Sequence, residues 1–155
     1  MSSVASFQQT KEQERAKEAW EAIIEVDSYK HIKVDEIKKK YRSLVLKSSV
    51  LILSNGLGQA VAFFVSKSQP KEKKQQSPDN IVHMLLLKHI WDWLKKVGIC
   101  ELNQQDIKET HKFPKWITLA TSEQYRRATM ETLAYLHWLR RFAEAVLPDV
   151  EEEEK

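Results

Sequence analysis

The pattern of apolar and polar residues along the chain predicts a protein built from helices. Apolar positions recur every three or four residues over 7–26, from 35 onwards, over 78–97 and over 125–147, which is the spacing of one helix face. Asp35 is the expected N-cap of the second of these helices. Pro78 and Asp79 begin the third and Gly98 ends it, because glycine readily adopts the conformation that terminates a helix.

The last of these helices has the clearest pattern. A partial capping signal at Ser122 precedes it, and Pro148 follows its end. At 1.5 Å per residue, about 25 residues give a length of roughly 37 Å, enough to cross a small domain. The expected apolar face consists of Ala128, Thr132, Leu136, Leu139, Ala143, Val146 and Leu147.

Residues 50–65 form the most apolar stretch of the chain and contain two of its three glycines. Because the stretch is apolar on nearly all sides, it predicts a buried central helix that begins after Ser48 and Ser49. It is too short for a membrane span, which needs about 20 apolar residues. Residues 66–80 predict an exposed linker, and residues 99–121 predict a short helix at 104–109 and a turn around Trp116, separated by Pro114.

Length and composition favour one small helical domain. The chain has 155 residues, and its three glycines and four prolines leave little turn material for a sheet. We therefore predict an all-α fold, a compact single-domain bundle of about six to seven helices over residues 1–148, with an acidic, disordered tail over 149–155. The single Cys100 excludes an internal disulfide, and the absence of a signal-peptide pattern indicates a reduced, cytoplasmic protein.

The formal net charge of +3 hides an asymmetry between the body and the tail. The tail carries five acidic residues and one basic residue, which leaves 24 basic and 17 acidic residues, a net +7, in the body. A basic body indicates a polyanionic partner, although many helical proteins of this charge bind no nucleic acid.

No pattern of catalytic or metal-binding residues is found. None of the five histidines has another four residues away, the spacing that places two imidazoles on one helix face. Gly56 and Gly58 do not form a phosphate loop. A dinucleotide-binding fingerprint needs a small residue at position 61, where this chain has Val61, and a Walker loop needs a lysine at position 59, where it has Gln59. The sequence therefore predicts a protein that is not an enzyme and that has no metal and no cofactor.

The same glycines are candidates for a close contact. A residue without Cβ lets another helix approach closely, so Gly56 and Gly58 predict helix packing or a subunit interface. Asn55 and Gln59 lie four residues apart on one face and either bond to a neighbouring subunit or cap an interrupted helix. Trp138 lies off the main apolar face of its helix and is suited to core packing, to a subunit contact or to stacking on a base.

Basic residues gather on two of the predicted helices. Lys38, Lys39, Lys40, Arg42 and Lys47 lie on one, and Arg126, Arg127, Arg140 and Arg141 lie on the other. The two arginine doublets are fourteen residues apart, nearly four helical turns, so they project in similar directions. Such a row suits a phosphate backbone, and a solvated face paired with nearby glutamates is the alternative.

Two long motifs, in this order, resemble a known family. KYRSL at 40–44 followed by ILSNGLGQAVAF at 52–63, and RRAT-ETLAYL-WLRRFA over 126–143, are similar to the small all-helical subunit of type III-B (Cmr) CRISPR effector complexes. The likeness covers most of the chain, apart from 66–80, 99–121 and the acidic tail.

The resemblance implies a non-catalytic subunit whose copies stack into a minor filament beside the subunits that carry the guide. Its expected partners are the other Cmr subunits, copies of itself, the CRISPR guide RNA and the single-stranded target RNA. The resemblance also implies that six basic residues contact phosphates or acidic residues of neighbouring subunits: Arg42, Lys47, Arg126, Arg127, Arg140 and Arg141. A helical assembly module that meets only proteins is the alternative, and a DNA-binding helix-turn-helix is disfavoured because its recognition helix should be polar.

Overall fold

The computed structural model describes residues 9–72, 74–103 and 105–149, and within these ranges the chain is helical, without a β-strand. The six helices are α2 (Lys11–Asp27), α3 (Val34–Asn55), α4 (Leu57–Ser68), α5 (Pro78–Lys96), α6 (Glu109–Leu119) and α7 (Ser122–Val146). The all-α prediction is confirmed. The predicted tail beyond Asp149 and the predicted helix start at Phe7 lie outside the described residues.

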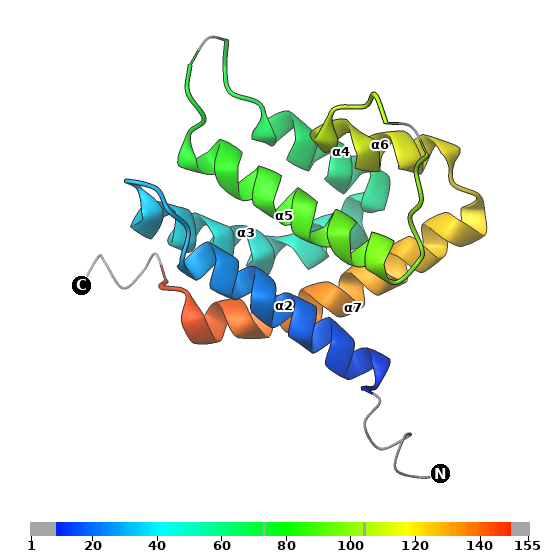
Figure 1. Ribbon diagram of the computed structural model, residues 1–155, viewed down its shortest axis with the longest axis horizontal. Helices are drawn as coiled ribbons and strands as arrows, with labels where there is room; N and C mark the ends of the chain where they lie inside the picture. The colour runs from blue at the N-terminus through cyan, green and yellow to red at the C-terminus, as the bar shows by residue number, and fades with distance from the viewer. Residues whose placement is uncertain (1–8, 73, 104, 150–155) are drawn as a thin grey trace.

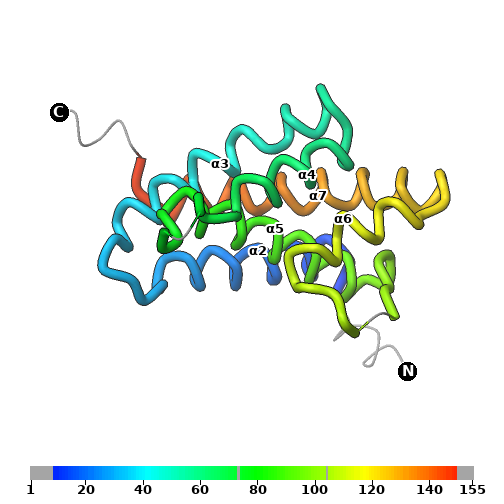
Figure 2. Tube along the Cα trace, turned by 90° about the horizontal axis from the view of Figure 1, so that it is seen from above, coloured from blue at the N-terminus to red at the C-terminus, as the bar shows by residue number. Residues whose placement is uncertain are grey.

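The longer helices α2, α3, α5 and α7 make up the body of the bundle, and the shorter α4 and α6 lie together against α5 (Figure 1). Helix α7 packs along both α2 and α3, so the first and the last of the described helices are neighbours. Helix α5 packs on α3 and α4, and α6 lies against α4 and α5. In the view from above, α5 runs between α2 and α3 (Figure 2). No helix within the described ranges is both long and apolar enough to cross a bilayer.

Helix α5, not the segment 50–65, is the most enclosed element. Twelve of its 19 residues are buried, because neighbouring helices surround it. Helix α5 begins with a capping box between Ser77 and Asn80, with Pro78 at its first position, and Gly98 ends it with a φ of +79°. The prediction for this helix is confirmed at both ends.

The predicted buried helix over 50–65 is wrong in two respects. Ser48 and Ser49 lie inside α3. The Ser48 hydroxyl donates to the Leu44 carbonyl oxygen at 2.6 Å, so its hydrogen bond is made within the helix and the helix continues. The chain breaks instead at Gly56, whose φ of +88° and ψ of 158° suit only glycine. The segment is also not fully buried, since Val50 is 62% and Leu53 71% exposed.

Two further boundaries differ from the prediction. Helix α3 begins at Val34 with Lys33 at its N-cap, so Asp35 lies in the first turn, where its charge favours the helix dipole. The N-cap of α7 is Thr121 rather than Ser122, because Thr121 forms a capping box with Gln124. The apolar face predicted for α7 is confirmed, with Val146 the one member that is half-buried.

The prediction for residues 104–109 and for Pro114 is also wrong. Residues 105–107 are bends, residue 104 is not described, and the helix of this region is α6, which contains Pro114. Pro114 removes one hydrogen bond to the carbonyl of Thr110. The helix persists because Phe113 and Trp116, on either side of the proline, are almost completely buried.

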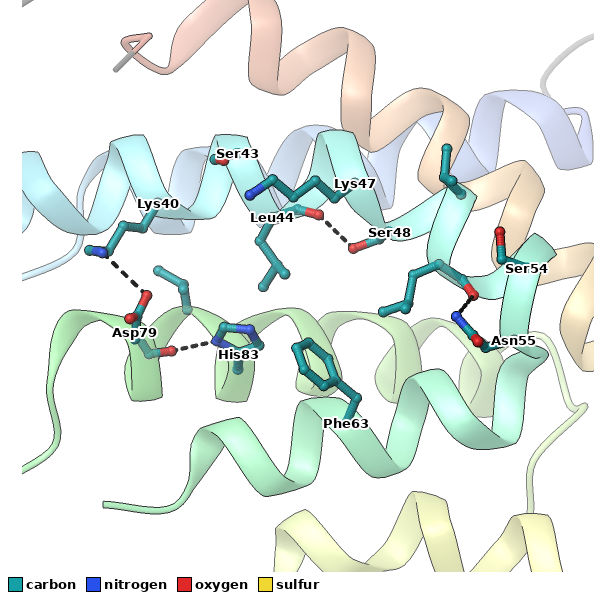
Figure 3. Close-up of a pocket in the computed structure, with 13 residues that line it drawn as sticks. Lys40, Ser43, Leu44, Lys47, Ser48, Ser54, Asn55, Phe63, Asp79 and His83 are labelled. Atoms are coloured by element: carbon teal, nitrogen blue, oxygen red, sulfur yellow. Dashed lines mark hydrogen bonds and ion pairs between the residues drawn. The ribbon is translucent and has the colours of Figure 1, made fainter. Parts of the chain in front are cut away.

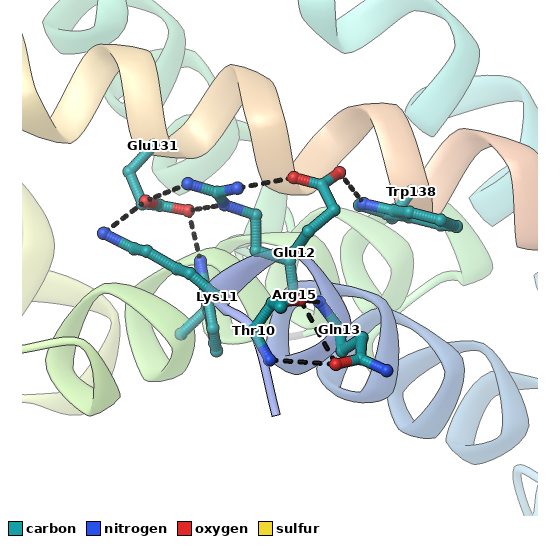
Figure 4. Close-up of polar contacts among 8 residues, drawn as sticks. Thr10, Lys11, Glu12, Gln13, Arg15, Glu131 and Trp138 are labelled. Atoms are coloured by element: carbon teal, nitrogen blue, oxygen red, sulfur yellow. Dashed lines mark hydrogen bonds and ion pairs between the residues drawn. The ribbon is translucent and has the colours of Figure 1, made fainter. Parts of the chain in front are cut away.

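A polar cluster joins α2, α5 and α7 beneath the surface (Figure 4). The Glu131 carboxylate is only 5% exposed and accepts two hydrogen bonds from Arg15, at 2.5 and 3.0 Å, and one from the Trp93 indole at 3.0 Å. Lys11 lies 3.2 Å from it. Burial raises the pKa of Glu131, but the hydrogen bonds from Arg15, Trp93 and Lys11 outweigh burial and hold that pKa below its ordinary value.

Candidate nucleic-acid and subunit interfaces

Four of the six predicted RNA-binding residues lie together on the outer face of α7. Arg126, Arg127, Arg140 and Arg141 are all exposed. Fourteen residues at 3.6 per turn leave each doublet rotated by only about 40° from the other, so both project from the same side. Arg140 lies 3.8 Å from Glu144, whereas the other three make no ion pair within the described part of the chain. The α7 arginine face is therefore available to an anionic partner.

The other two predicted residues lie elsewhere, on α3. The Arg42 guanidinium donates to the Leu147 carbonyl oxygen at 3.1 Å and lies 3.6 Å from Asp149, so it holds the end of α7 and the residues after it against α3. Lys47 is exposed and lines a groove on the opposite side of α3, toward α5. The six residues do not form one surface.

The two glycines of the predicted subunit interface make a close contact within the chain. The Gly58 amide donates to the Tyr125 hydroxyl at 2.8 Å. A Cβ on Gly58 would lie 3.3 Å from that hydroxyl and 3.4 Å from Ile117. Glycine at this position thus lets α6 and α7 approach the start of α4.

The two amides beside the glycines lie on the surface. Asn55 donates to the Leu51 carbonyl oxygen at 3.3 Å, one turn back in its own helix, and Gln59 is exposed. The role of Asn55, Gly56, Gly58 and Gln59 in contacts between subunits stays a prediction.

Trp138 packs against helix α2. Its indole nitrogen donates to the Glu12 carboxylate at 2.5 Å, and its ring lies 5.7 Å from that of Phe142. The Trp20 ring meets Phe142 edge-on at 5.3 Å and is 44% exposed. Part of this aromatic cluster therefore reaches solvent between α2 and α7, while Trp138 itself is half-buried.

A groove of about 510 Å³ between α3, α4 and α5 has no counterpart in the sequence-based predictions (Figure 3). Its walls come from residues far apart in the chain, including Lys47 of α3, Phe63 of α4 and His83 of α5. The signal that could have located it is the row Lys40, Ser43, Lys47 and Ser54 on α3, which recurs at helical spacing and is polar beside an apolar region.

A chain of titratable groups runs from the buried Tyr41 through His89 to Glu25, which is partly exposed. The Tyr41 hydroxyl lies 2.7 Å from His89 Nδ1, and His89 Nε2 lies 2.5 Å from Glu25. An ionised Glu25 can only accept, so Nε2–H donates to it and, in the neutral ring, Nδ1 accepts from Tyr41. Tyr41 is completely buried, which raises the pKa of its hydroxyl well above the ordinary value. A substrate cannot reach it, and the chain of groups supports the fold.

The remaining candidate for chemistry is also enclosed. Burial raises the pKa of the Cys100 thiol to about 12, which leaves it protonated and unreactive at neutral pH. No cluster of three or more metal-ligating side chains occurs within the described ranges.

Comparison with known proteins gives a consistent result. Residues 11–146 match the family model described as CRISPR-associated protein (Cas_Cmr5). The CRISPR system Cmr subunit Cmr5 of Thermus thermophilus is 28% identical over 114 residues, which cover 74% of this chain and 81% of that protein. The crystal structure of a CRISPR-associated Cmr5 family protein, also from Thermus thermophilus, is similar with a TM-score of 0.62 and 26% identity, over 90% of this chain and 100% of that one. These matches confirm the resemblance drawn from the two motifs.

Proposed function

The chain belongs to the Cmr5 family of CRISPR-associated proteins, and from this membership we propose that it is a non-catalytic small subunit of a type III-B (Cmr) ribonucleoprotein complex. In this proposal, copies of the chain stack into a minor filament and help to hold single-stranded target RNA along the guide. The observation that carries it is the family match over residues 11–146, which runs from the first residue of α2 to the last residue of α7.

The α7 arginine face supports the nucleic-acid part of the proposal. Arg126, Arg127 and Arg141 are exposed and lack ion-pair partners among the described residues, and arginine is suited to bidentate bonding with phosphate. Sequence reading by these side chains is not expected, because base pairing with the guide supplies specificity in RNA-guided systems. Contact with the phosphate backbone alone is sufficient for such a role.

The direct test is RNA binding by the purified full-length chain as salt is varied. Fluorescence anisotropy with a labelled single-stranded RNA should give an affinity that falls as salt rises. For single strands, each phosphate contact contributes about −0.7 to the slope of log K against log salt. The double variant Arg126→Glu, Arg127→Glu should therefore bind RNA more weakly, and its slope should be less steep by about 1.4. The matched control is Lys95→Glu on the exposed side of α5. Unchanged affinity and slope in the arginine variant would remove α7 from the RNA site.

The alternative function is an assembly module that meets only proteins. The exposed apolar side chains favour it, since Leu53 is 71%, Met130 63% and Leu119 60% exposed. Purification of the native complex separates the two. Under the leading proposal the complex contains CRISPR guide RNA and the isolated chain retains RNA in a salt-sensitive way. Under the alternative the chain still co-purifies with neighbouring subunits, but the isolated chain retains no RNA.

A further inference from the structure

The groove between α3, α4 and α5 has the size and shape of a binding site. Its volume of about 510 Å³ falls within the range of about 300–1,000 Å³ that is usual for sites holding small molecules. In Figure 3, α3 forms one wall, and the side chains of His83 and Phe63 extend toward it from α5 and α4. The interior of the groove is apolar, through Leu44 and Val82, and its edges are polar.

The charges around the groove favour an anion. Lys40 lies 3.3 Å from Asp79, so these two largely compensate each other. Lys47 is exposed and forms no ion pair with any residue that the structure describes. Lys67 lies 5.7 Å from the centre of the Phe63 ring and acts electrostatically on His83. Two ammonium groups and one carboxylate therefore line the groove, which leaves a net charge of about one positive unit, and Lys67 adds a further positive charge beside Phe63.

The aromatic side of the groove offers a partly exposed ring. Phe63 is 40% exposed although it is a large apolar side chain, and its ring meets the His83 imidazole edge-on at 5.7 Å. The Lys67 ammonium lies over this ring, and the side chain stays partly exposed beside it. Exposed aromatic rings beside basic residues are the common feature of sites that stack the bases of single-stranded nucleic acids.

His83 adds a hydrogen-bond acceptor. Its Nδ1 lies 2.7 Å from the Asp79 carbonyl oxygen and must donate to it, because a carbonyl can only accept. Burial lowers the pKa of His83, so the ring is neutral near pH 7 and Nε2 carries a lone pair. A ribose hydroxyl or an exocyclic amine of a base is a suitable donor to this atom.

We propose that the groove between α3, α4 and α5 binds one nucleotide of single-stranded RNA, with a phosphate at Lys47 and the base against Phe63. The proposal rests on the proposed function and adds to it a contact site that is separate from the α7 arginine face. The two sites share no residue, since none of the four arginines of α7 lines the groove. Charge alone would suit an acidic peptide equally, and the partly exposed ring next to a neutral acceptor favours a nucleotide.

The experiment compares RNA with a polyanion that has no bases. Binding of a labelled oligouridylate of about 15 nucleotides and of inorganic polyphosphate is measured for the full-length chain and for Phe63→Leu, which keeps an apolar side chain but removes the ring. The variant should bind oligouridylate about tenfold more weakly, within the range known for one lost base–aromatic stack, and polyphosphate as well as the parent does. Lys47→Glu should weaken the binding of both ligands. The matched control is Trp20→Leu, an aromatic residue of similar exposure on α2.

The possible outcomes separate this proposal from the proposed function. If Phe63→Leu binds oligouridylate as tightly as the parent while the α7 arginine variant binds it weakly, the groove site is overturned and the proposed function stands. If neither the parent nor any variant binds oligouridylate, both fail. If a polyglutamate peptide binds and that binding is lost in Phe63→Leu, the groove is a peptide site and the proposal is overturned. Thermal unfolding of each variant checks that it is folded, and Phe63→Met replaces Phe63→Leu if the latter is not.

Discussion

Replacing Glu131 with glutamine tests how much the polar cluster between α2, α5 and α7 stabilises the protein. The substitution preserves the size of the side chain and removes its charge. It leaves the Arg15 guanidinium, which is 17% exposed, without the carboxylate that now accepts two of its hydrogen bonds. The Trp93 indole loses the charge on its acceptor as well.

The expected loss is about 3 kcal/mol of unfolding free energy. Removing one member of a buried ion pair costs about 3–5 kcal/mol, and the lower end applies because Arg15 retains some contact with water. In a protein of this size, each kcal/mol shifts the melting temperature by about 2–4 °C, so the variant should melt about 6–12 °C lower than the parent.

Urea unfolding followed by circular dichroism, together with thermal melts at pH 7, measures both quantities. Glu144→Gln is the control, because the Arg140–Glu144 pair is exposed and its loss should change stability by less than about 1 kcal/mol. A second variant, Arg15→Met with Glu131→Gln, should recover part of the loss, since no unpaired charge then stays buried. A loss below about 1 kcal/mol in Glu131→Gln would refute the reasoning.

Acid should abolish the stabilisation that the Glu131 carboxylate provides. The pKa of Glu131 lies below its ordinary value in the folded protein, so its stabilising effect is fully present above that ordinary value of 4.5. It is lost as the pH falls through the lower, folded-state value. The difference in stability between the parent and Glu131→Gln should therefore shrink below pH 4.5, and a difference that stays constant on acidification would contradict this account.

Three other predictions follow from the interior and the helix ends. Gly56→Ala should lower the free energy of unfolding, measured in urea, by about 2 kcal/mol, because alanine is strained at a φ of +88°. Gly98→Ala should lose less, because its φ of +79° is similar but its Cβ would meet open space; equal losses would contradict this. Cys100 should resist iodoacetamide at about pH 8 until the protein unfolds, because its pKa is raised to about 12; rapid labelling of the native protein, seen by mass spectrometry, would refute its burial. The hydrogen bond from His89 lowers the pKa of Glu25 to about 2. The parent should therefore be more stable than Glu25→Gln above pH 4.5, and this difference should disappear as the pH falls to about 2. Urea midpoints of both proteins across this range measure the difference, and a difference that did not shrink would contradict the prediction.

The helices that the sequence predicted well have both an unbroken apolar face and a strong signal at an end. Helix α5 has Pro78 at its start and Gly98 after its end, and α7 has a continuous apolar face. These features act within a few residues of each other, so the sequence contains all the information that they need.

The predictions were wrong where a residue allows two local outcomes or where packing with distant residues decides the outcome. Ser48 was expected to begin a helix, but its hydroxyl bonds to Leu44 and the helix continues. Gly56 breaks the segment instead, at the place where Tyr125, far along the chain, approaches α4. Pro114 was expected to separate a short helix at 104–109 from a turn around Trp116, but it lies inside α6, where the burial of Phe113 and Trp116 keeps the helix intact.

The candidate site also has one part that the local sequence predicts and one part that depends on packing. The exposure of Arg126, Arg127, Arg140 and Arg141 follows from their position opposite the apolar face of α7, so the sequence could predict it. For the groove, the polar row on α3 could have indicated only one wall, because Phe63 and His83 meet Lys47 only when three helices pack.

The contact between α2 and α7 has a consequence for how the polypeptide emerges from the ribosome. Helix α2 is synthesised before the other described helices, but the carboxylate that its Arg15 binds lies 116 residues later. The nascent chain therefore carries the part of α2 that packs on α7 uncovered until almost all of the chain has been translated. Completion of the native core has to wait for release of the C-terminal helix from the exit tunnel, so a message truncated before α7 should yield a product that aggregates or is degraded.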